Sequence, residues 1–318
     1  MKRKINFPFA FCSLICTFAT GKFFYYYNKE NRDSDCDDIQ KQKVERMEMT
    51  ENYISSVQNP KIKLLTALQK KSSERRSRGL FVVEGVRELQ HCVEAGFEVE
   101  SVFCCREFLG DENDWLAQIS SADGIDSSRF YSVSSKVYEH IAYRGSTEGV
   151  VAVVKCRERN LDDLELGENP LLMVLESVEK PGNLGAVLRS ADAARADAVI
   201  VCDPLTDLYN PNLIRASIGA VFTVPVVACD STTCIDFLKS KNIKILTAQL
   251  QDSSLYYETD MRRGVALVMG TESTGLTQQW RLAADAHIRI PMLGRLDSLN
   301  VSVSAAILLF EAVRQRKK

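Results

Sequence analysis

The stretch LLMVLESVEKPGNLGAVLRSADAARADAVIVCD, residues 171–203, decides the fold of the second half of the chain. It begins with an apolar run of strand length (171–178) and ends with another (198–203). A helical pattern near 183–196 lies between the two runs. Because each run is apolar on both faces, the stretch predicts two parallel strands of a sheet that is covered by helices on both sides.

The same alternation of strands and helices continues through the rest of the chain. Further strand-like runs lie at 224–228, 243–248, 264–270 and 286–291, and helical patterns lie near 211–219, 231–241, 274–284 and 299–316. In parallel sheets of this kind, ligands bind beyond the carboxyl ends of the strands. The loops after Val178, Gly270 and Ile290 are therefore the places where we expect a site.

The first of these loops, ESVEKPGNLGAVLR (176–189), joins a strand to a helix. Pro181 breaks the strand, and Asn183 is predicted to cap the following helix. Gly185 keeps the start of the helix slim, so that another backbone or a ligand can approach. Read alone, the segment is also typical of an ordinary strand-to-helix turn. The chain contains neither GxGxxG nor GxxxxGK[ST], so the usual dinucleotide and nucleoside triphosphate loops are absent.

The second and third loops combine glycines with polar side chains. MGTESTGL (269–276) places two glycines around Glu272, which indicates a tight turn or the close approach of a ligand. IPMLGRLDSLNVSVSAA (290–306) carries several Ser and Asn residues before an apolar helix, and Ser298 is predicted to cap that helix. Helix capping alone would explain either segment when it is read by itself.

Composition narrows the protein class. The chain has 318 residues, a net charge of -2, ten cysteines and three histidines. Its length suits about two domains, and its hydrophobic and charged fractions are those of an ordinary globular protein. The histidines lie far apart in sequence, so a histidine-rich metal site is not expected. The cysteines form no CxxC pair and lie mostly in apolar runs, which is typical of reduced, buried cysteine.

The first 29 residues contain no acidic residue and several basic ones around an apolar stretch. This pattern is typical of a targeting segment. A secretory signal would look similar, but the cysteine usage favours the matrix of a chloroplast or mitochondrion, with the cytoplasm as the alternative. The apolar stretch (5–20) is too short and too interrupted for a transmembrane helix, so no membrane partner is expected. Residues 1–52 are thus predicted to form a leader and an acidic linker.

Charge reverses in the next segment, where residues 53–90 carry eight basic side chains against three acidic ones. The excess indicates either a solvated helix face or an arm that contacts RNA phosphates. The candidates for phosphate contact are Lys61, Lys63, Arg75, Arg76 and Arg78. Strand-like runs at 79–85, 99–105, 130–133 and 149–155, with a helix over 86–96, predict a small α/β domain. We place this domain at 53–156, a polar linker at 157–170 and the second domain at 171–318.

Taken together, the three loops resemble a known family. PGNLGAxxR, MGTESxGL and IPMxGxxxSLNVSVS occur in the order of the three motifs of the SpoU (TrmH) family of RNA ribose methyltransferases, in the SPOUT class. The resemblance covers about residues 170–316, and residues 53–156 resemble the ribosomal protein L30e-like substrate-binding domain of many members. It implies an α/β fold whose parallel-sheet domain contains a deep trefoil knot.

The resemblance also implies an activity and a set of site residues. The activity is transfer of a methyl group from S-adenosylmethionine to a ribose 2′-hydroxyl of rRNA or tRNA, with rRNA slightly favoured and no metal required. Catalytic positions fall on Asn183, Arg189, Glu272, Ser298 and Asn300, and cofactor positions fall on Gly270, Thr271, Ile290, Met292 and Leu299. Arg215 is implied to contact RNA or the rim of the cofactor site, and members act as homodimers through the knotted domain.

Two alternatives are left open by the sequence. The chain could be a non-catalytic RNA-binding factor for ribosome assembly that retained the fold, although the complete set of polar motif residues argues against this. A different nucleotide-dependent α/β enzyme is disfavoured because the phosphate-binding loops are absent.

Overall fold

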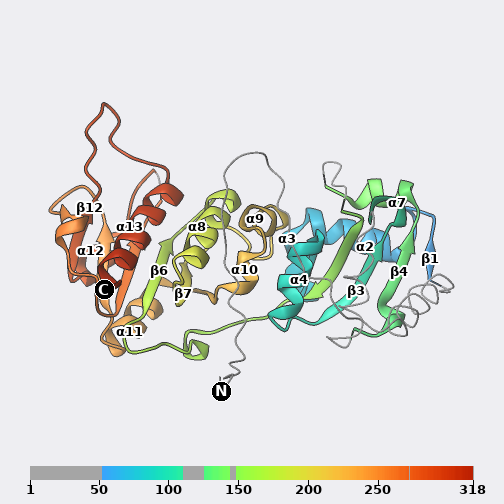
Figure 1. Cartoon of the computed structure of the whole chain (residues 1–318), viewed down its shortest axis with the longest axis horizontal. Helices are drawn as coiled ribbons and strands as arrows, with labels where there is room; N and C mark the ends of the chain where they lie inside the picture. The colour runs from blue at the N-terminus through green and yellow to red at the C-terminus, as the bar shows by residue number, and fades with distance from the viewer. Residues whose placement is uncertain (1–51, 110–124, 144–147, 272, 318) are drawn as a thin grey trace, which may run out of the picture. The chain divides into compact units, whose positions relative to one another are not determined.

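The computed structural model describes residues 52–109, 125–143, 148–271 and 273–317 (Figure 1). The predicted leader and Glu272 lie outside the described residues. Within the described ranges, no helix is both long enough and apolar enough to cross a membrane.

A mixed five-stranded sheet of order β1-β4-β3-β5-β2 organises the first domain. Its strands are β1 (Tyr53–Ile54), β2 (Leu80–Glu84), β3 (Val99–Cys104), β4 (Phe130–Val133) and β5 (Val150–Lys155). The described helices of this domain are α2 (Pro60–Lys70), α3 (Ser72–Arg78), α4 (Val86–Glu94), α5 (Arg106–Leu109) and α7 (Ser135–Ile141). Strand β3 runs parallel to β4 and antiparallel to β5. The strands and the helix predicted between residues 79 and 155 are confirmed.

Helix α2 shows why the basic segment folds as it does. Asn59 caps the helix by accepting a hydrogen bond from the backbone N–H of Lys61 at 2.9 Å, and Pro60 occupies the first turn. The buried stripe consists of Ile62, Leu65 and Leu68, each fully buried. Their spacing brings them onto one helix face, so the lysines of α2 are left on the solvent side.

The second domain contains a seven-stranded sheet of order β10-β12-β9-β11-β6-β7-β8, in which every neighbouring pair is parallel. Its strands are β6 (Leu171–Glu176), β7 (Ala198–Cys202), β8 (Val226–Cys229), β9 (Lys244–Ala248), β10 (Ser254–Leu255), β11 (Val265–Met269) and β12 (Ala286–Arg289). The six predicted strands are confirmed. Strand β10 was not predicted, because two residues carry no periodicity. The trefoil knot stays a prediction.

Helices cover both faces of this sheet, as the apolar runs predict (Figure 1). They are α8 (Pro181–Ala193), α9 (Pro211–Ser217), α10 (Ala220–Thr223), α11 (Ser231–Ser240), α12 (Gln278–Ala283) and α13 (Val301–Arg316). Met173 and Leu175 of β6 pack in one core with Leu188 of α8. Their strand neighbours Leu172 and Val174 pack in another core, on the opposite face, with residues of α11 and α12. Successive side chains of a strand alternate between faces, so both cores depend on the same short strands.

Candidate active site

Three loops at the carboxyl edge of the second sheet enclose two adjoining cavities. The first, which we call the β11–β12 cavity, has a volume of about 370 Å³ and lies among the ends of β9, β11 and β12 and the start of α13. The second, the β6–β11 cavity, has a volume of about 250 Å³ and lies among the ends of β6 and β11 and the start of α8. The two cavities share Gly270, Thr271, Ser273 and Val301 in their walls. A ligand in one is therefore adjacent to a ligand in the other.

The β11–β12 cavity gathers the residues predicted to bind a cofactor. Its lining includes Gly270, Thr271, Ile290, Met292 and Leu299, together with Ser298. Apolar side chains from β11 and α13, Met269 and Leu308, complete part of the wall. Polar side chains line the cavity as well, and such a mixture of apolar and polar groups suits a small molecule that carries both.

Two polar atoms in this cavity lack a partner. Among the described residues, Gln249 Oε1 and Arg281 Nε are the buried side-chain nitrogen or oxygen atoms without a hydrogen bond. Both residues line the β11–β12 cavity. Buried polar atoms are nearly always satisfied in native proteins, so an unpaired acceptor and an unpaired donor in one cavity indicate a polar ligand. The sequence alone points to neither residue, because both lie outside the three motif loops.

The loop after β11 is closed too tightly for any residue but glycine at its start. A Cβ atom on Gly270 would lie 2.2 Å from the carbonyl carbon of Gly275. Thr271 and Gly275 form an isolated antiparallel bridge, and Gly275 has a φ of +69°. Main-chain atoms of this hairpin-like turn thus form part of the wall between the two cavities.

Glu176, at the end of β6, connects this turn to the first loop. The side chain is 2% exposed. Its carboxylate accepts a hydrogen bond from the backbone N–H of Thr277 at 2.9 Å and another from the Thr277 hydroxyl at 2.6 Å. Helix α12 begins after Thr277, so the predicted start near Thr274 is wrong, because the chain is still turning there. Ser177 follows with a φ of +52°, a strained conformation that is common at functional sites.

Asn183 and Asn300 join the first and third loops. The Nδ2 atom of Asn300 donates a hydrogen bond to Oδ1 of Asn183 at 3.2 Å. Asn183 does not cap its helix as predicted, because α8 already begins at Pro181 and Asn183 lies in its first turn. Asn183 instead lines the β6–β11 cavity.

The cap of α13 also differs from the prediction. Helix α13 begins at Val301, and Asn300 caps it by accepting a hydrogen bond from the backbone N–H of Ser302 at 2.9 Å. Ser298 lies two residues too early for that role, and its hydroxyl is 3.3 Å from a carboxylate oxygen of Asp297. It remains in the lining of the β11–β12 cavity.

Arg189 lies on the exposed side of α8 and forms no salt bridge with any described residue. It is not part of the lining of either cavity. Gly185, on the same helix, packs against α9, where a Cβ atom would lie 2.6 Å from Cβ of Ala216. The missing side chain at Gly185 therefore lets α9 pack closely against the start of α8.

The predicted RNA contacts divide into two groups. Lys61, Lys63, Arg76 and Arg78 are exposed on α2 and α3. Arg75 is buried, and its Nε atom lies 2.6 Å from a carboxylate oxygen of Asp207 while Nη1 donates to the carbonyl of Leu68. The prediction that Arg75 contacts RNA is therefore wrong, because its guanidinium is enclosed and neutralised.

Arg215 is partly engaged within the protein. Its Nη2 atom lies 3.1 Å from a carboxylate oxygen of Glu84, and its guanidinium carbon lies 3.8 Å from the centre of the Tyr143 ring. The side chain is nevertheless 40% exposed. Its contact with RNA stays a prediction.

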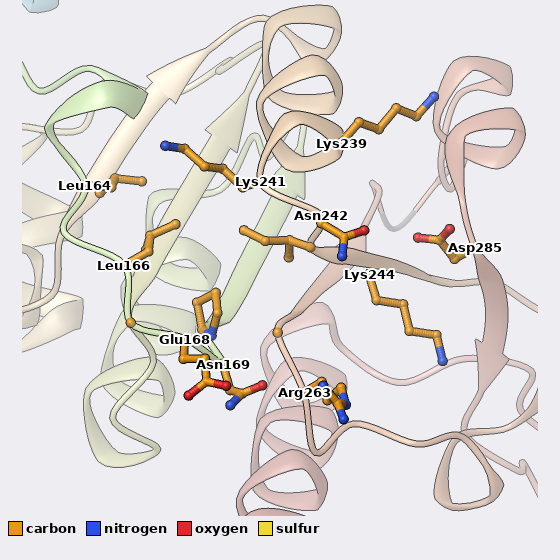
Figure 2. Close-up of a pocket in the computed structure, with 14 residues that line it drawn as sticks. Leu164, Leu166, Glu168, Asn169, Lys239, Lys241, Asn242, Lys244, Arg263 and Asp285 are labelled. Atoms are coloured by element: carbon orange, nitrogen blue, oxygen red, sulfur yellow. The ribbon is translucent and has the colours of Figure 1, made fainter.

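A larger cavity, of about 710 Å³, lies at the opposite edge of the second sheet. Figure 2 shows Lys241, Lys244 and Arg263 around it together with the acidic side chains of Glu168 and Asp285. Its lining residues precede strands β6, β9, β11 and β12, so the cavity lies at their amino ends. Ligands of parallel sheets bind at the other edge, and no motif residue lines this cavity.

Comparison with known proteins identifies the family. A family model described as the SpoU rRNA methylase family matches residues 170–310, and an MRM3-like substrate-binding domain matches residues 59–152. The 23S rRNA (guanosine-2′-O-)-methyltransferase RlmB of Bordetella pertussis is 37% identical over 196 residues, which cover 59% of this chain and 79% of that protein. The chain belongs to the SpoU rRNA methylase family. The resemblance seen in the three motifs is confirmed.

Further similarities extend over both domains. The 23S rRNA (guanosine(2553)-2′-O)-methyltransferase RlmP of Bacillus subtilis is 29% identical over 258 residues, which cover 81% of this chain and 97% of that protein. A solved structure of the AdoMet-bound rRNA methyltransferase from Sinorhizobium meliloti matches with a TM-score of 0.74 and 29% identity. The match covers 82% of this chain and 97% of that one. The SpoU fold and the preceding substrate-binding domain are thus both present in this family member.

Proposed function

We propose that this protein transfers a methyl group from S-adenosylmethionine to a ribose 2′-hydroxyl of ribosomal RNA. The observation that carries the proposal is the pair of adjoining cavities. The predicted cofactor residues line one, Asn183 lines the other, and a backbone turn forms their shared wall. The relatives RlmB and RlmP are 23S rRNA methyltransferases, which favours ribosomal RNA over tRNA.

The β11–β12 cavity fits the cofactor. Ile290, Met292 and Leu299 supply apolar contacts for an adenosine. Gln249 Oε1 can accept a hydrogen bond from an amino group, and Arg281 Nε can donate one to a carboxylate or a ring nitrogen. S-adenosylmethionine carries all of these groups, and when bound it supplies a methyl group on a positively charged sulfur.

The residues of the chain then have to hold the ribose hydroxyl and stabilise the charge that develops on its oxygen. The Asn183–Asn300 pair fixes two amides where the first and third loops meet. A guanidinium carries N–H donors and no acceptor, so Arg189 is suited to donating hydrogen bonds and not to accepting the hydroxyl proton. We assign it to binding an RNA phosphate and orienting the nucleotide.

The test is methyl transfer from labelled S-adenosylmethionine to unmodified organellar rRNA, with tRNA as a second substrate. We expect label in rRNA and its loss in Arg189→Ala, while cofactor binding by that variant is unchanged. Arg195→Ala, which changes an exposed arginine just after the same helix, should transfer normally. Normal transfer by Arg189→Ala would contradict the assigned role. Cofactor and RNA binding without transfer to any RNA would favour the non-catalytic assembly factor.

We also propose that the protein is a homodimer that associates through the second domain. Val303 and Phe310 are 47% and 48% exposed and lie seven residues apart, on one face of α13. A second copy of the chain would remove this apolar face from water. Light scattering on the purified protein should give twice the mass of the chain, and Phe310→Glu should give the mass of one chain. A monomeric wild type would contradict the proposal.

Finally, we propose import into a chloroplast or mitochondrion. The support is the acid-free, basic leader of residues 1–29. Residues 1–52 fused to a fluorescent protein should direct it to one of these organelles. A diffuse cytoplasmic signal would contradict the proposal.

A further inference from the structure

Three cysteines from three separate elements meet on one face of the second sheet. Cys202 ends β7 and Cys229 ends β8, and the two are register partners in parallel strands. Their side chains therefore leave the same face of the sheet. Cys234 lies in the first turns of α11, which packs against that face. The three Sγ atoms all lie within 4.8 Å of one another.

The surroundings enclose these sulfur atoms on all but one side. Cys202 and Cys234 are fully buried in an apolar core, whereas Cys229 is half-buried at its margin. All three are free thiols. Among the described residues, this is the one group of three or more Cys, His, Asp or Glu side chains close enough to hold a metal ion. An ion could reach the cluster from the side of Cys229.

We propose that Cys202, Cys229 and Cys234 together bind a thiophilic d¹⁰ cation, Cu⁺ or Zn²⁺. Thiolates are soft ligands that select these ions over Mg²⁺ or Ca²⁺. Three sulfur ligands suffice for Cu⁺, whereas Zn²⁺ takes a fourth ligand, which solvent supplies at the exposed side of Cys229. Each metal–sulfur bond forms as an S–H bond breaks, and the proton is released to solvent.

The position of Cys234 supports a thiolate cluster. Its sulfur lies near the N-terminus of a ten-residue helix, where the helix dipole favours negative charge. A hydrogen-bonded network adjoins the cluster: Trp280 Nε1 donates to the Ser231 hydroxyl at 2.9 Å, which donates to Asp203 at 2.6 Å. Asp203 follows Cys202 in the chain, and Ser231 lies between Cys229 and Cys234. The network therefore joins the backbone segments that carry the three cysteines.

The site is distinct from the methyltransferase site. The cysteines belong to β7, β8 and α11, whereas the two cavities are built from β6, β9, β11, β12, α12 and the starts of α8 and α13. A bound ion would join two strands and a helix, so its role is to stabilise this side of the domain. The proposal therefore does not depend on the proposed function.

The experiment uses the full chain, reduced with a phosphine and freed of metal. Cd²⁺ serves as a spectroscopic probe, because thiolate–Cd²⁺ bonds give an ultraviolet charge-transfer band. We expect the band to saturate at one ion per chain, with release of protons and a higher melting temperature. Separate competition titrations with Zn²⁺ and with Cu⁺ then show which ion binds more tightly.

Variants test the ligand set. Cys234→Ser and Cys229→Ser should each weaken Cd²⁺ binding by at least about tenfold, the least that loss of a supporting group costs a metal site. Cys92→Ser, at an equally buried cysteine of the first domain, should bind Cd²⁺ as the wild type does. Cys229 is half-buried, so its variant keeps the test valid should Cys234→Ser fail to fold. A wild type without the band, or unchanged affinity in Cys229→Ser, would overturn the proposal.

Discussion

Glu176 and Thr277 are joined by two hydrogen bonds, of 2.9 Å to the backbone N–H and 2.6 Å to the hydroxyl, across 101 residues of sequence. The bonds connect the end of β6 to the start of α12. Because the carboxylate is buried, neither bond can be replaced easily by water. The relative positions of the first two motif loops depend on this pair.

Glu176→Gln should therefore weaken cofactor binding and stability together. Glutamine can still accept from the backbone N–H, but its amide N–H has to donate to the Thr277 hydroxyl, and both bonds lose the charge that strengthens them, at a cost of about 1 kcal/mol. Thermal melting and calorimetric titration with S-adenosylmethionine measure the two effects. Thr277→Ser keeps both hydrogen bonds and is the control. Wild-type affinity in Glu176→Gln would show that the pair does not position the loop.

Gly270→Ala should impair the cofactor site with little chemical change. The added methyl group would meet Gly275 at 2.2 Å, so the turn between the two cavities has to move. We expect the affinity for S-adenosylmethionine to fall by at least about tenfold, which corresponds to about 1.4 kcal/mol. Gly294→Ala adds the same methyl group in the third loop, where no atom lies within 4 Å, and should bind normally. Equal affinities of the two variants would show that the turn at Gly270 accommodates a side chain.

Gln249→Leu and Arg281→Met should each lower the affinity for the cofactor without lowering the stability of the protein. Each removes a buried, unpaired polar atom, so the melting temperature without cofactor should change little, although Gln249→Leu also gives up an exposed hydrogen bond from Nε2 to the carbonyl of Gln251. The affinity for S-adenosylmethionine should fall. Arg262→Met, at an exposed arginine paired with Asp260, is the control and should leave that affinity unchanged. A loss of stability with full affinity would mean that these atoms serve the fold alone.

Arg75 and Arg76 are adjacent in sequence and should behave in opposite ways. Arg75→Met removes the charged partner of the part-buried Asp207 and a donor to the carbonyl of Leu68, which should cost about 1–3 kcal/mol of unfolding free energy. Arg76→Met should change that free energy by less than about 0.5 kcal/mol, because Arg76 is exposed. It should instead weaken RNA binding and lower its salt dependence. Denaturant melts and filter binding at several salt concentrations distinguish the two.

Glu88 should make stability depend on pH. Burial raises the pKa of Glu88 above its usual range, and the nearby charge of Glu148 raises it further. Below the ordinary carboxyl pKa of about 4.3 the side chain is protonated in both the folded and unfolded states. As pH rises through the raised pKa, the folded state has to hold a disfavoured charge and stability is lost. Glu88→Gln should therefore melt above the wild type at neutral pH and equal it in acid.

Glu98, a second carboxylate of the first domain, should make stability depend on pH in the opposite direction. A hydrogen bond from Lys155 lowers the pKa of Glu98, which is exposed. Its contribution to stability is present above the ordinary carboxyl pKa and is lost as pH falls through the lowered value. Glu98→Gln should thus melt slightly below the wild type at neutral pH. If both variants shift in the same direction, titration of these two groups is not the cause.

The sequence was most informative where local pattern and structure coincide. The central strands of the second domain, β6, β7, β9 and β11, are apolar runs, because their two faces contact two different cores. The cofactor residues Gly270, Ile290 and Leu299 come together because the ends of parallel strands share an edge. Motif order and strand direction sufficed for that inference.

Features that depend on contacts distant in sequence could not be predicted. Whether Asn300 or Ser298 caps α13 depends on where the loop ends its turn, since both side chains are good caps. The burial of Arg75 depends on Asp207, which lies 132 residues away. The three cysteines show no recognisable spacing, because a strand register and a helix bring them together.

The hydrogen bond between Asn183 and Asn300 also constrains the stage of protein synthesis at which the chain can begin to modify RNA. The two residues are 117 positions apart, and α13 packs against α8 only after the chain between them has folded. On the ribosome, the first motif loop emerges long before the segment that carries Asn300. Closing so long a loop is entropically costly and slow. A nascent or stalled chain that lacks this segment therefore has no complete cavity, and the capacity to modify RNA arises in one late step of synthesis.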